Sequence, residues 1–157
     1  MTHVKIRVAT QADAPALARF RYELRSSETQ TIEGDAEFIE RCTVWMRERL
    51  RSKSSWECWL AECEETPCGN VWAQVVEKIP NPAAETECYV YLTNFYVREE
   101  YRGQGIGTRL LSEVLAWSKG KNAHTIILWP RERSKTLYAR HGFAAADDLM
   151  FLQLDRV

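Results

Sequence analysis

Three glycines alternate in residues 101–108 (YRGQGIGT), between a strand-like run and an amphipathic helical run. Inside a helix each glycine costs about 1 kcal/mol relative to alanine, so helix stability does not explain this spacing. Without a Cβ atom the backbone can turn tightly and approach a ligand closely. The first turn of a helix also has N–H groups without partners, at the positive end of the helix dipole. The segment therefore predicts a strand–loop–helix unit whose main-chain amides bind an anion, the alternative being a turn that serves only packing.

The spacing of the glycines limits which phosphate-containing ligands this segment could bind. A dinucleotide loop requires the pattern GxGxxG, and Thr108 stands where its third glycine would be. A P-loop requires Gly-Lys-Ser or Gly-Lys-Thr, which does not follow here. Binding of NAD or ATP is therefore the weakest hypothesis for this segment.

The remaining pattern predicts one α/β domain over residues 1–157. Apolar residues with helical spacing predict a helix after Thr10, a helix from the glycine segment to about Lys119, and further helices over residues 35–51 and 134–140. Strands are expected over residues 4–8, 56–63, 70–79, 88–97, 124–129 and 149–154. The second and third of these should form an antiparallel hairpin, because the turn formers Pro67, Gly69 and Asn70 lie at their junction.

Composition excludes several classes of protein. The 21 Lys and Arg residues balance 22 Asp and Glu residues, a net charge of −1 that disfavours a nucleic-acid partner. No apolar run approaches the ~20 residues of a membrane span, and the first residues lack the order of a secretory signal, so we expect a cytoplasmic protein without a membrane partner. The five cysteines form no CxxC pair and the three histidines are far apart in sequence, so we expect free thiols and no metal site.

Two separated parts of the chain resemble one family. The pattern Arg102-x-x-Gly105-x-Gly107, preceded by LTNFYV and REEY, resembles the coenzyme A loop of the GNAT superfamily of N-acetyltransferases. Downstream, TIILW followed by SKTLYARHGF resembles the fifth strand of that family and its tyrosine-bearing helix. The matching residues run from about Leu92 to Phe143, whereas the order of elements agrees along the whole chain.

The resemblance implies a fold and a cofactor. The fold would be a single GNAT-like domain with a mixed, mostly antiparallel sheet of six to seven strands, about four flanking helices and two splayed parallel central strands. Acetyl-CoA would be the co-substrate, with its pyrophosphate on the amides of residues 102–108 and Ile106 turned into the core. Its pantetheine arm would pair with the backbone of the strand end. The cofactor-binding residues implied in this way are Phe95, Tyr96, Val97, Arg102, Gly103, Gln104, Gly105, Ile106, Gly107, Thr108, Arg131 and Ser134.

Tyr138 matches the tyrosine that lies near the sulfur in this family. A phenol with a pKa near 10 stays protonated at neutral pH and can donate a proton to the departing thiolate. The alternative is that Tyr138 only packs its helix.

The sequence departs from the family pattern at two positions. Many members have a glutamate base four residues before the strand-end valine, and this chain has Thr93 there. The amine could lose its proton to water held by Asn94, Thr93 or Tyr91, or to a carboxylate elsewhere. Alternatively, the acceptor amine has a low pKa and needs no strong base. The second departure is Arg131 in place of an asparagine, where it or Arg133 could meet phosphate charge.

Two further features bear on the acceptor. Residues 26–40 carry five acidic and no basic side chains, which would favour a cationic amine if the segment is more than a solvated loop. The six tryptophans lie too far apart in sequence to predict an aromatic cage, and we expect most of them in the core or at an interface.

These observations predict an enzyme that transfers an acetyl group from acetyl-CoA to a primary amine in a ternary complex. The catalytic candidates are Tyr138, Asn94 and Thr93, and the acceptor would be a small molecule or a peptide. The resemblance also makes a homodimer reasonable. The competing hypothesis, favoured by the missing glutamate, is a coenzyme A-binding sensor or scaffold without chemistry.

Overall fold

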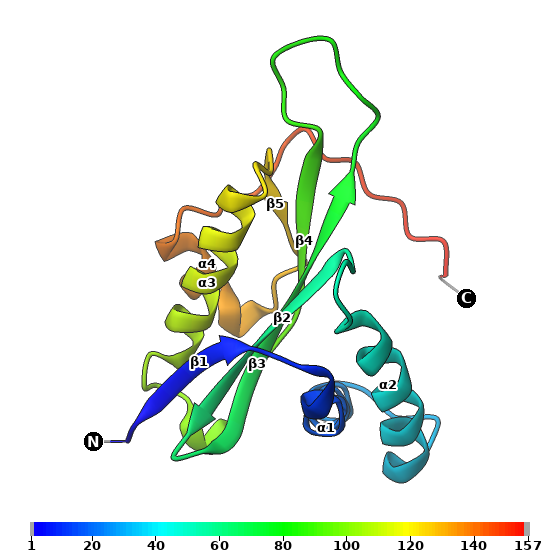
Figure 1. Cartoon of the computed structure of the whole chain (residues 1–157), viewed down its shortest axis with the longest axis vertical. Coiled ribbons are helices and arrows are strands. Elements are labelled where there is room, and N and C mark those ends of the chain that lie inside the picture. Colours follow the sequence, from blue (N-terminus) through cyan, green and yellow to red (C-terminus); the bar gives the residue numbers. More distant parts are fainter. Residues whose placement is uncertain (1, 156–157) are drawn as a thin grey trace.

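A computed structural model describes residues 2–155 and contains a mixed sheet with the strand order β1-β2-β3-β4-β5 (Figure 1). The strands are β1 (Val4–Val8), β2 (Trp56–Cys63), β3 (Thr66–Glu77), β4 (Cys88–Val97) and β5 (Ile126–Ile127). The helices are α1 (Ala14–Ser26), α2 (Asp35–Arg49), α3 (Ile106–Gly120) and α4 (Lys135–Arg140), with short 3-10 turns at Gln11–Asp13, Glu99–Tyr101 and Glu132–Ser134. Neighbouring strands are antiparallel except for β4 and β5, which are parallel.

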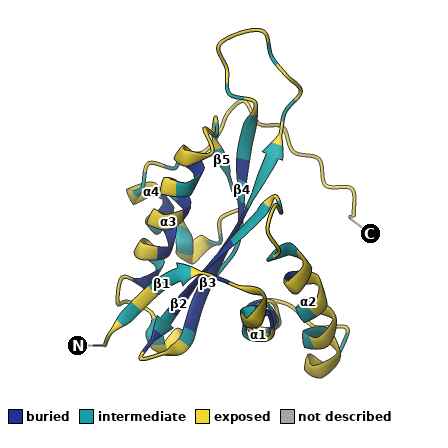
Figure 2. Cartoon of the chain, in the orientation of Figure 1, coloured by how far each residue is buried: buried dark blue, intermediate teal, exposed yellow. Residues whose placement is uncertain are grey.

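Period-two alternation along the central strands builds two cores, one on each face of the sheet. On β2, Trp59 and Ala61 pack with the apolar row of α3, while Cys58 and Leu60 pack with α1. Figure 2 shows the buried residues concentrated in the middle of β2, β3 and β4 and on the inner side of α3. The helices α1 and α2 therefore cover one face, and α3 and α4 cover the other (Figure 1).

The predicted fold class is confirmed, including the parallel pair of central strands, but the strand count is lower than expected. Five strands occur within the described residues, against the predicted six to seven. Residues 149–154 form no strand, and the side chains of Met150, Leu152 and Leu154 are at least four-fifths exposed. The prediction of a strand there was wrong because alternating apolar residues form a strand only beside a partner, and this segment lies away from β5 (Figure 1).

The hairpin of β2 and β3 is confirmed, but its turn lies earlier than predicted. The two residues at the turn are Glu64 and Glu65, with positive φ angles of 48° and 65°. Pro67, Gly69 and Asn70, which we assigned to the turn, lie within β3. Gly69 is needed there for a close approach, since a Cβ atom at this position would lie 2.9 Å from the carbonyl oxygen of Tyr96.

Toward its carboxyl end β4 loses its pairing with β5, while its pairing with β3 continues to Val97 after a shift in register. Its register with β5 covers only Val90 and Tyr91, preceded by a hydrogen bond from the N–H group of His124 to the Cys88 carbonyl, so the pairing on that side ends at Tyr91. On the other side the register with β3 shifts between Asn70 and Trp72. Asn94 adopts a positive φ of 55° at this β-bulge, which redirects the end of the strand.

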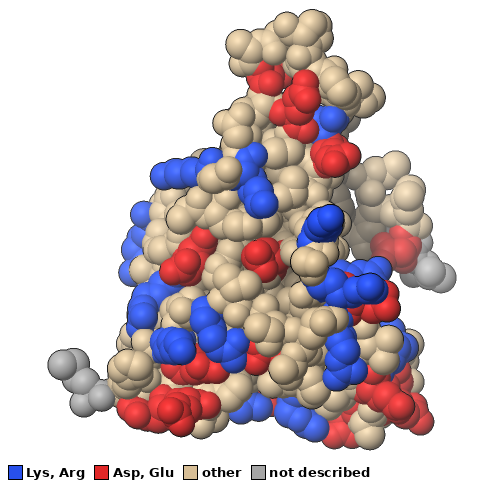
Figure 3. All heavy atoms as spheres, in the orientation of Figure 1, with Lys and Arg blue, Asp and Glu red and all other residues tan. Residues whose placement is uncertain are grey.

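The surface offers no single-sign field on the face drawn in Figure 3, where Lys and Arg lie among Asp and Glu. Among residues 2–155, none of the helices has the length and apolar character that a membrane span requires.

The close approach at Gly69 yields a test of the packing between β3 and β4. We expect Gly69→Ala to reduce the free energy of unfolding by about 1–3 kcal/mol, because the backbone of β4 must move away from the new methyl group. Urea denaturation measures this change. Gly120→Ala is the matched control, since nothing lies within 4 Å of a Cβ atom at that position, and it should change stability by less than about 1 kcal/mol. Equal effects of the two substitutions would contradict the proposed close packing.

Candidate active site

The glycine segment forms the predicted turn into α3. Gly103 and Gly105 have positive φ angles of 77° and 80°, and Gly105 is the N-cap residue of the helix. The first bond of the helix runs from the N–H group of Arg109 to the carbonyl of Gly105 at 3.1 Å. The N–H groups of residues 106–108 therefore need acceptors outside the helix. The Ile106 side chain is buried in the core, as the sequence predicted, while its backbone remains at the turn.

A cavity of about 290 Å³, here called the loop cavity, lies over these amides. Its opposite wall comes from the 3-10 turn Glu132–Ser134 and from α4, and includes Arg133, Ser134 and Arg140. Neither of these two arginines forms an ion pair with any residue that the structure describes. The backbone amides and two unpaired cations make this cavity suited to an anion. Arg102 closes its base, because its Nε atom donates to the carbonyl of Val97 at 2.8 Å.

Most of the predicted cofactor residues meet at the loop cavity. Its lining contains Phe95, Val97, Arg102, Gly103, Gly105, Ile106, Gly107, Thr108 and Ser134. Gln104 is exposed on the turn and is not part of that lining. Tyr96 points to the other face of the sheet, where its hydroxyl donates to Glu23 at 3.0 Å.

Arg131 also lies elsewhere. It forms an ion pair with Glu28, and its Nη1 atom lies 3.5 Å from the carbonyl oxygen of Phe95. The second carboxylate oxygen of Glu28 accepts from Arg25 at 3.3 Å. Of the two arginines that we considered for phosphate charge, Arg131 is engaged in this ion-pair network, whereas Arg133 lines the loop cavity together with Arg140.

A second cavity, of about 310 Å³, lies where β4 and β5 part, and we call it the splay cavity. It is lined by the end of β4, by Leu128 and Trp129 after β5, and by Tyr138 of α4. Phe95 and Ser134 line both this cavity and the loop cavity, so the two are neighbours.

Tyr138 is the buried phenol of the splay cavity. Its ring packs against Phe95 and Phe143, at centroid distances of 6.2 Å and 5.4 Å. Burial raises the pKa of Tyr138 above its ordinary value, and the positive charge of Arg131 only partly opposes this. The phenol is therefore protonated at neutral pH and can act as a proton donor at this point.

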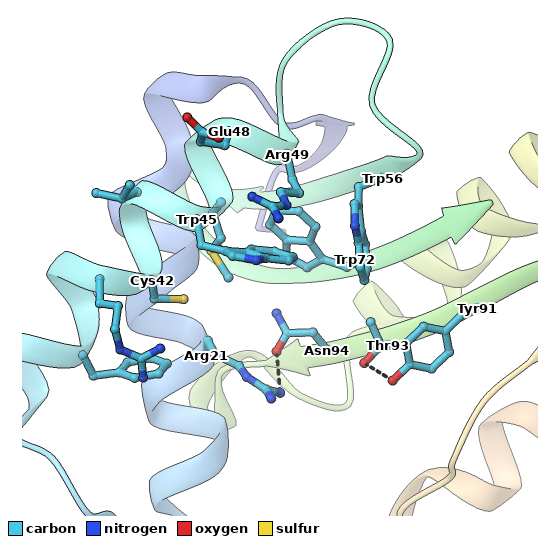
Figure 4. A pocket seen from close by; sticks show the side chains of 14 residues that line it. Arg21, Cys42, Trp45, Glu48, Arg49, Trp56, Trp72, Tyr91, Thr93 and Asn94 are labelled. Atoms are coloured by element: carbon cyan, nitrogen blue, oxygen red, sulfur yellow. Dashed lines mark hydrogen bonds between the residues drawn. The ribbon is translucent and has the colours of Figure 1, made fainter. Parts of the chain in front are cut away.

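A third and larger cavity, of about 730 Å³, lies between α2 and the sheet (Figure 4), and we call it the α2 cavity. It shares Arg21, Tyr91, Thr93 and Asn94 with the splay cavity. The predicted catalytic residues Thr93 and Asn94 thus lie at the boundary between the two. The hydroxyl of Tyr91 lies 3.1 Å from Oγ1 of Thr93, and Nη1 of Arg21 donates to Oδ1 of Asn94 at 3.3 Å.

The sequence analysis missed two features of the α2 cavity. No sequence pattern singled out Arg21, because it comes close to Asn94 only when α1 packs on the sheet. Three tryptophans, Trp45, Trp56 and Trp72, meet in the wall of this cavity with ring centroids 5.5–6.1 Å apart. The expectation that the tryptophans are too scattered to gather was wrong for these three.

The end of β4 is tied to α1 by a charged network. The carboxylate of Glu23 accepts from Nη2 and Nε of Arg98 at 2.8 Å and 3.1 Å, and from the hydroxyl of Tyr96. Arg98 also stacks over Phe20, 4.9 Å from the ring centroid. This network holds the strand end that separates the loop cavity from the opposite face.

Comparison with known proteins places the chain in a family. The family model described as "Acetyltransferase (GNAT) family" matches residues 19–143. No curated protein sequence matches the chain.

Solved structures reproduce the fold at low sequence identity. A GCN5-related N-acetyltransferase from Ralstonia eutropha is 22% identical, with 96% of this chain and 99% of that chain covered and a TM-score of 0.79. A predicted acetyltransferase with acetyl-CoA from Clostridium acetobutylicum is 22% identical, with 97% of each chain covered and a TM-score of 0.80. An aminoglycoside N-acetyltransferase in complex with CoA is 15% identical, with 98% and 95% covered and a TM-score of 0.73.

The Glu23 network yields a pH-dependent test. Burial raises the pKa of Glu23, but the hydrogen bonds from Arg98 and Tyr96 outweigh it, so the net pKa is lowered. A lowered pKa in the folded state means that the stabilisation is present above the pKa of the unfolded chain and is lost as the pH falls through the folded value. We therefore expect Glu23→Gln to reduce stability by about 1 kcal/mol at pH 7, and this difference should shrink as the pH falls below the ordinary pKa of a glutamate and vanish once Glu23 is protonated in the folded protein.

Urea denaturation across the pH range measures this difference. Glu99→Gln is the control, because Glu99 is exposed, and its effect should be small at every pH. A loss of stability in Glu23→Gln that stays constant down to pH 3 would argue against the charged network.

Proposed function

This chain belongs to the acetyltransferase (GNAT) family, and from that premise we propose that it transfers an acetyl group from acetyl-CoA to a primary amine. The proposed unit is one catalytic domain over residues 1–157, in which amine and acetyl-CoA react directly in a ternary complex. The observation that carries this proposal is the row of three cavities. The loop, splay and α2 cavities adjoin in that order, because each shares lining residues with the next.

The loop cavity suits the pyrophosphate of coenzyme A. Cβ atoms at Gly103 and Gly105 would meet no protein atom within 4 Å, so the space over the turn is open to a ligand. The amides of residues 106–108 would donate to the phosphate oxygens, and Arg133 and Arg140 would balance their charge. Ser134 offers a hydroxyl from the opposite wall.

The unpaired edge of β4 suits the pantetheine arm. Beyond Tyr91 this strand pairs with no strand on the β5 side, so the backbone around Phe95 is available to amides of a ligand, whereas the Val97 carbonyl already accepts from Arg102. The Arg131 guanidinium lies at the limit of hydrogen-bond distance from the Phe95 carbonyl and would move aside for such a ligand. The thioester would then lie in the splay cavity, beside Tyr138.

In the reaction, the neutral amine attacks the thioester carbonyl, so that a C–N bond forms and the C–S bond breaks. Tyr138 would give its proton to the departing thiolate, and the proton that the attacking nitrogen loses on forming the amide would return to the phenolate through water. A lysine-like amine, with a pKa near 10.4, is neutral only about once in 2,500 molecules at pH 7. Thr93 cannot accept its proton at neutral pH, and the nearby carboxylate of Glu28 is held by two arginines. Water at Thr93 and Asn94 is therefore the route that we propose for this proton.

The direct test is release of free thiol when the protein is incubated with acetyl-CoA and a panel of primary amines. We expect amine-dependent thiol release and an acetylated product identified by mass spectrometry. Binding of acetyl-CoA without turnover of any amine would favour the competing hypothesis of a coenzyme A sensor.

Tyr138→Phe tests the proton donor. We expect kcat to fall by about 100- to 10,000-fold, while the affinity for acetyl-CoA changes little, because the ring still packs against its neighbours. In the unsubstituted enzyme the raised pKa of Tyr138 keeps the donor protonated, so the rate should rise with pH between 7 and 9 as the amine loses its proton.

Steady-state kinetics across that pH range check both expectations. Tyr89→Phe is the control on the same sheet, since Tyr89 lines none of the three cavities, and it should leave kcat unchanged within about twofold. Full activity in Tyr138→Phe would remove this residue from the mechanism.

Arg133→Gln and Arg140→Gln test the loop cavity. Each should weaken coenzyme A binding by about tenfold, the effect expected for loss of a charge-assisted contact, and should leave the binding of pantetheine unchanged. Isothermal titration with both compounds measures this difference. Lys135→Gln is the control, because Lys135 is exposed and paired with Glu132 at 2.7 Å. If pantetheine binding weakens as much as coenzyme A binding, the arginines do not act through phosphate.

A further inference from the structure

The α2 cavity has an aromatic wall built from three elements. Trp45 comes from α2, Trp56 from β2 and Trp72 from β3, and Figure 4 shows their rings gathered on one side of the cavity. The ring planes of Trp56 and Trp72 meet at 75°, as do those of Trp45 and Trp56. Trp45 keeps 39% of its surface exposed although it lies in this cluster. Such a wall binds an aromatic or large apolar group by stacking and edge contacts.

Arg21 lies at the opposite side of the same cavity, where the cavity meets the splay cavity. This guanidinium has five N–H donors, and among the residues that the structure describes it donates one hydrogen bond, to Asn94 at 3.3 Å. Within residues 2–155, no carboxylate forms an ion pair with it, because Glu28 is held by Arg25 and Arg131. Burial, together with the positive charges of Arg25 and Arg131, lowers the pKa of Arg21.

An unpaired, partly buried cation is costly unless a ligand neutralises it. The other charged side chains that line the α2 cavity already have partners within the protein. Arg41 is paired with Glu33, Arg49 stacks over Trp45 at 4.5 Å from the ring centroid, and Glu48 faces Arg51 at 4.0 Å. Arg21 does not line the loop cavity, so the phosphates of coenzyme A are not its partner. The anionic group that would bind Arg21 therefore belongs to the acceptor substrate.

Resting on the acetyl transfer proposed above, we infer that the acceptor is an α-amino acid with an aromatic side chain. The amine must reach the splay cavity, and Arg21 lines both that cavity and the α2 cavity. A carboxylate bound to Arg21 must then lie within a few bonds of the amine, as it does in an α-amino acid. The side chain extends into the α2 cavity, where about 730 Å³ and the three tryptophans receive an aromatic ring.

The first experiment compares three acceptors at saturating acetyl-CoA by thiol release. L-Tryptophan carries both groups, tryptamine lacks the carboxylate, and L-alanine lacks the ring. We expect kcat/KM for L-tryptophan to exceed that for tryptamine by about 10- to 100-fold, the range for a bidentate charged contact, and that for L-alanine by at least about tenfold.

The second experiment repeats the comparison with Arg21→Gln. The preference for L-tryptophan over tryptamine should shrink to less than about threefold, while acetyl-CoA still raises the melting temperature, which shows that the variant is folded and binds its co-substrate. Arg19→Gln, an exposed position on the same helix, is the matched control and should keep the full preference.

Two outcomes would overturn the inference. One leaves the proposed acetyl transfer intact, and the other contradicts it as well. If tryptamine reacts as fast as L-tryptophan, or if Arg21→Gln keeps the preference, the acceptor class is wrong while acetyl transfer stands. If neither compound nor any other amine is acetylated although acetyl-CoA binds, the transfer itself fails and the acceptor class fails with it.

Discussion

The separation of β4 from β5 is the constraint on which the candidate site depends. Two strands that run parallel from one sheet edge would normally continue to pair, and here they pair only at Val90 and Tyr91. The resulting gap exposes backbone donors and acceptors that a folded chain does not leave unpartnered without a reason. The bulge at Asn94 redirects the end of β4, and this end is held by its pairing with β3 up to Val97 and by the hydrogen bonds of Tyr96 and Arg98 to Glu23.

The two faces of the sheet contribute different chemistry to this gap. The α3 face supplies the loop amides and the buried phenol, while the α1 and α2 face supplies Arg21 and the tryptophan wall. Alternation along β2 separates the two sets, since Trp56 points toward α2 and Trp59 toward α3, where it packs against Trp117. In the proposed reaction this alternation would let two unlike substrates bind from opposite faces, because each would meet its own wall and both would reach the same gap.

The parts of the site that depend on local sequence could be predicted, and those that depend on tertiary partners could not. The turn at Gly103 and Gly105, the start of α3 and the position of Tyr138 follow from patterns of a few residues. The turn of the hairpin was misplaced because Gly69 serves a contact with Tyr96, which lies 27 residues away in the chain, and not a local bend. The apolar run at residues 149–154 was mistaken for a strand because a pattern does not show whether a partner is present.

Arg21 is the clearest case of a site residue that the sequence could not predict. What distinguishes it is that no carboxylate among the described residues pairs with it, and this is visible only in the folded chain. Every other arginine that lines the splay and α2 cavities is paired with a carboxylate or stacked on a ring. Glu28 serves Arg25 and Arg131 together. A charge left unpaired among so many paired ones costs stability, and such costs in folded proteins concentrate where a ligand repays them. Arg21 lines the splay cavity, where an amine would have to approach the thioester. Its unpaired charge therefore bears on which acceptor the site would bind.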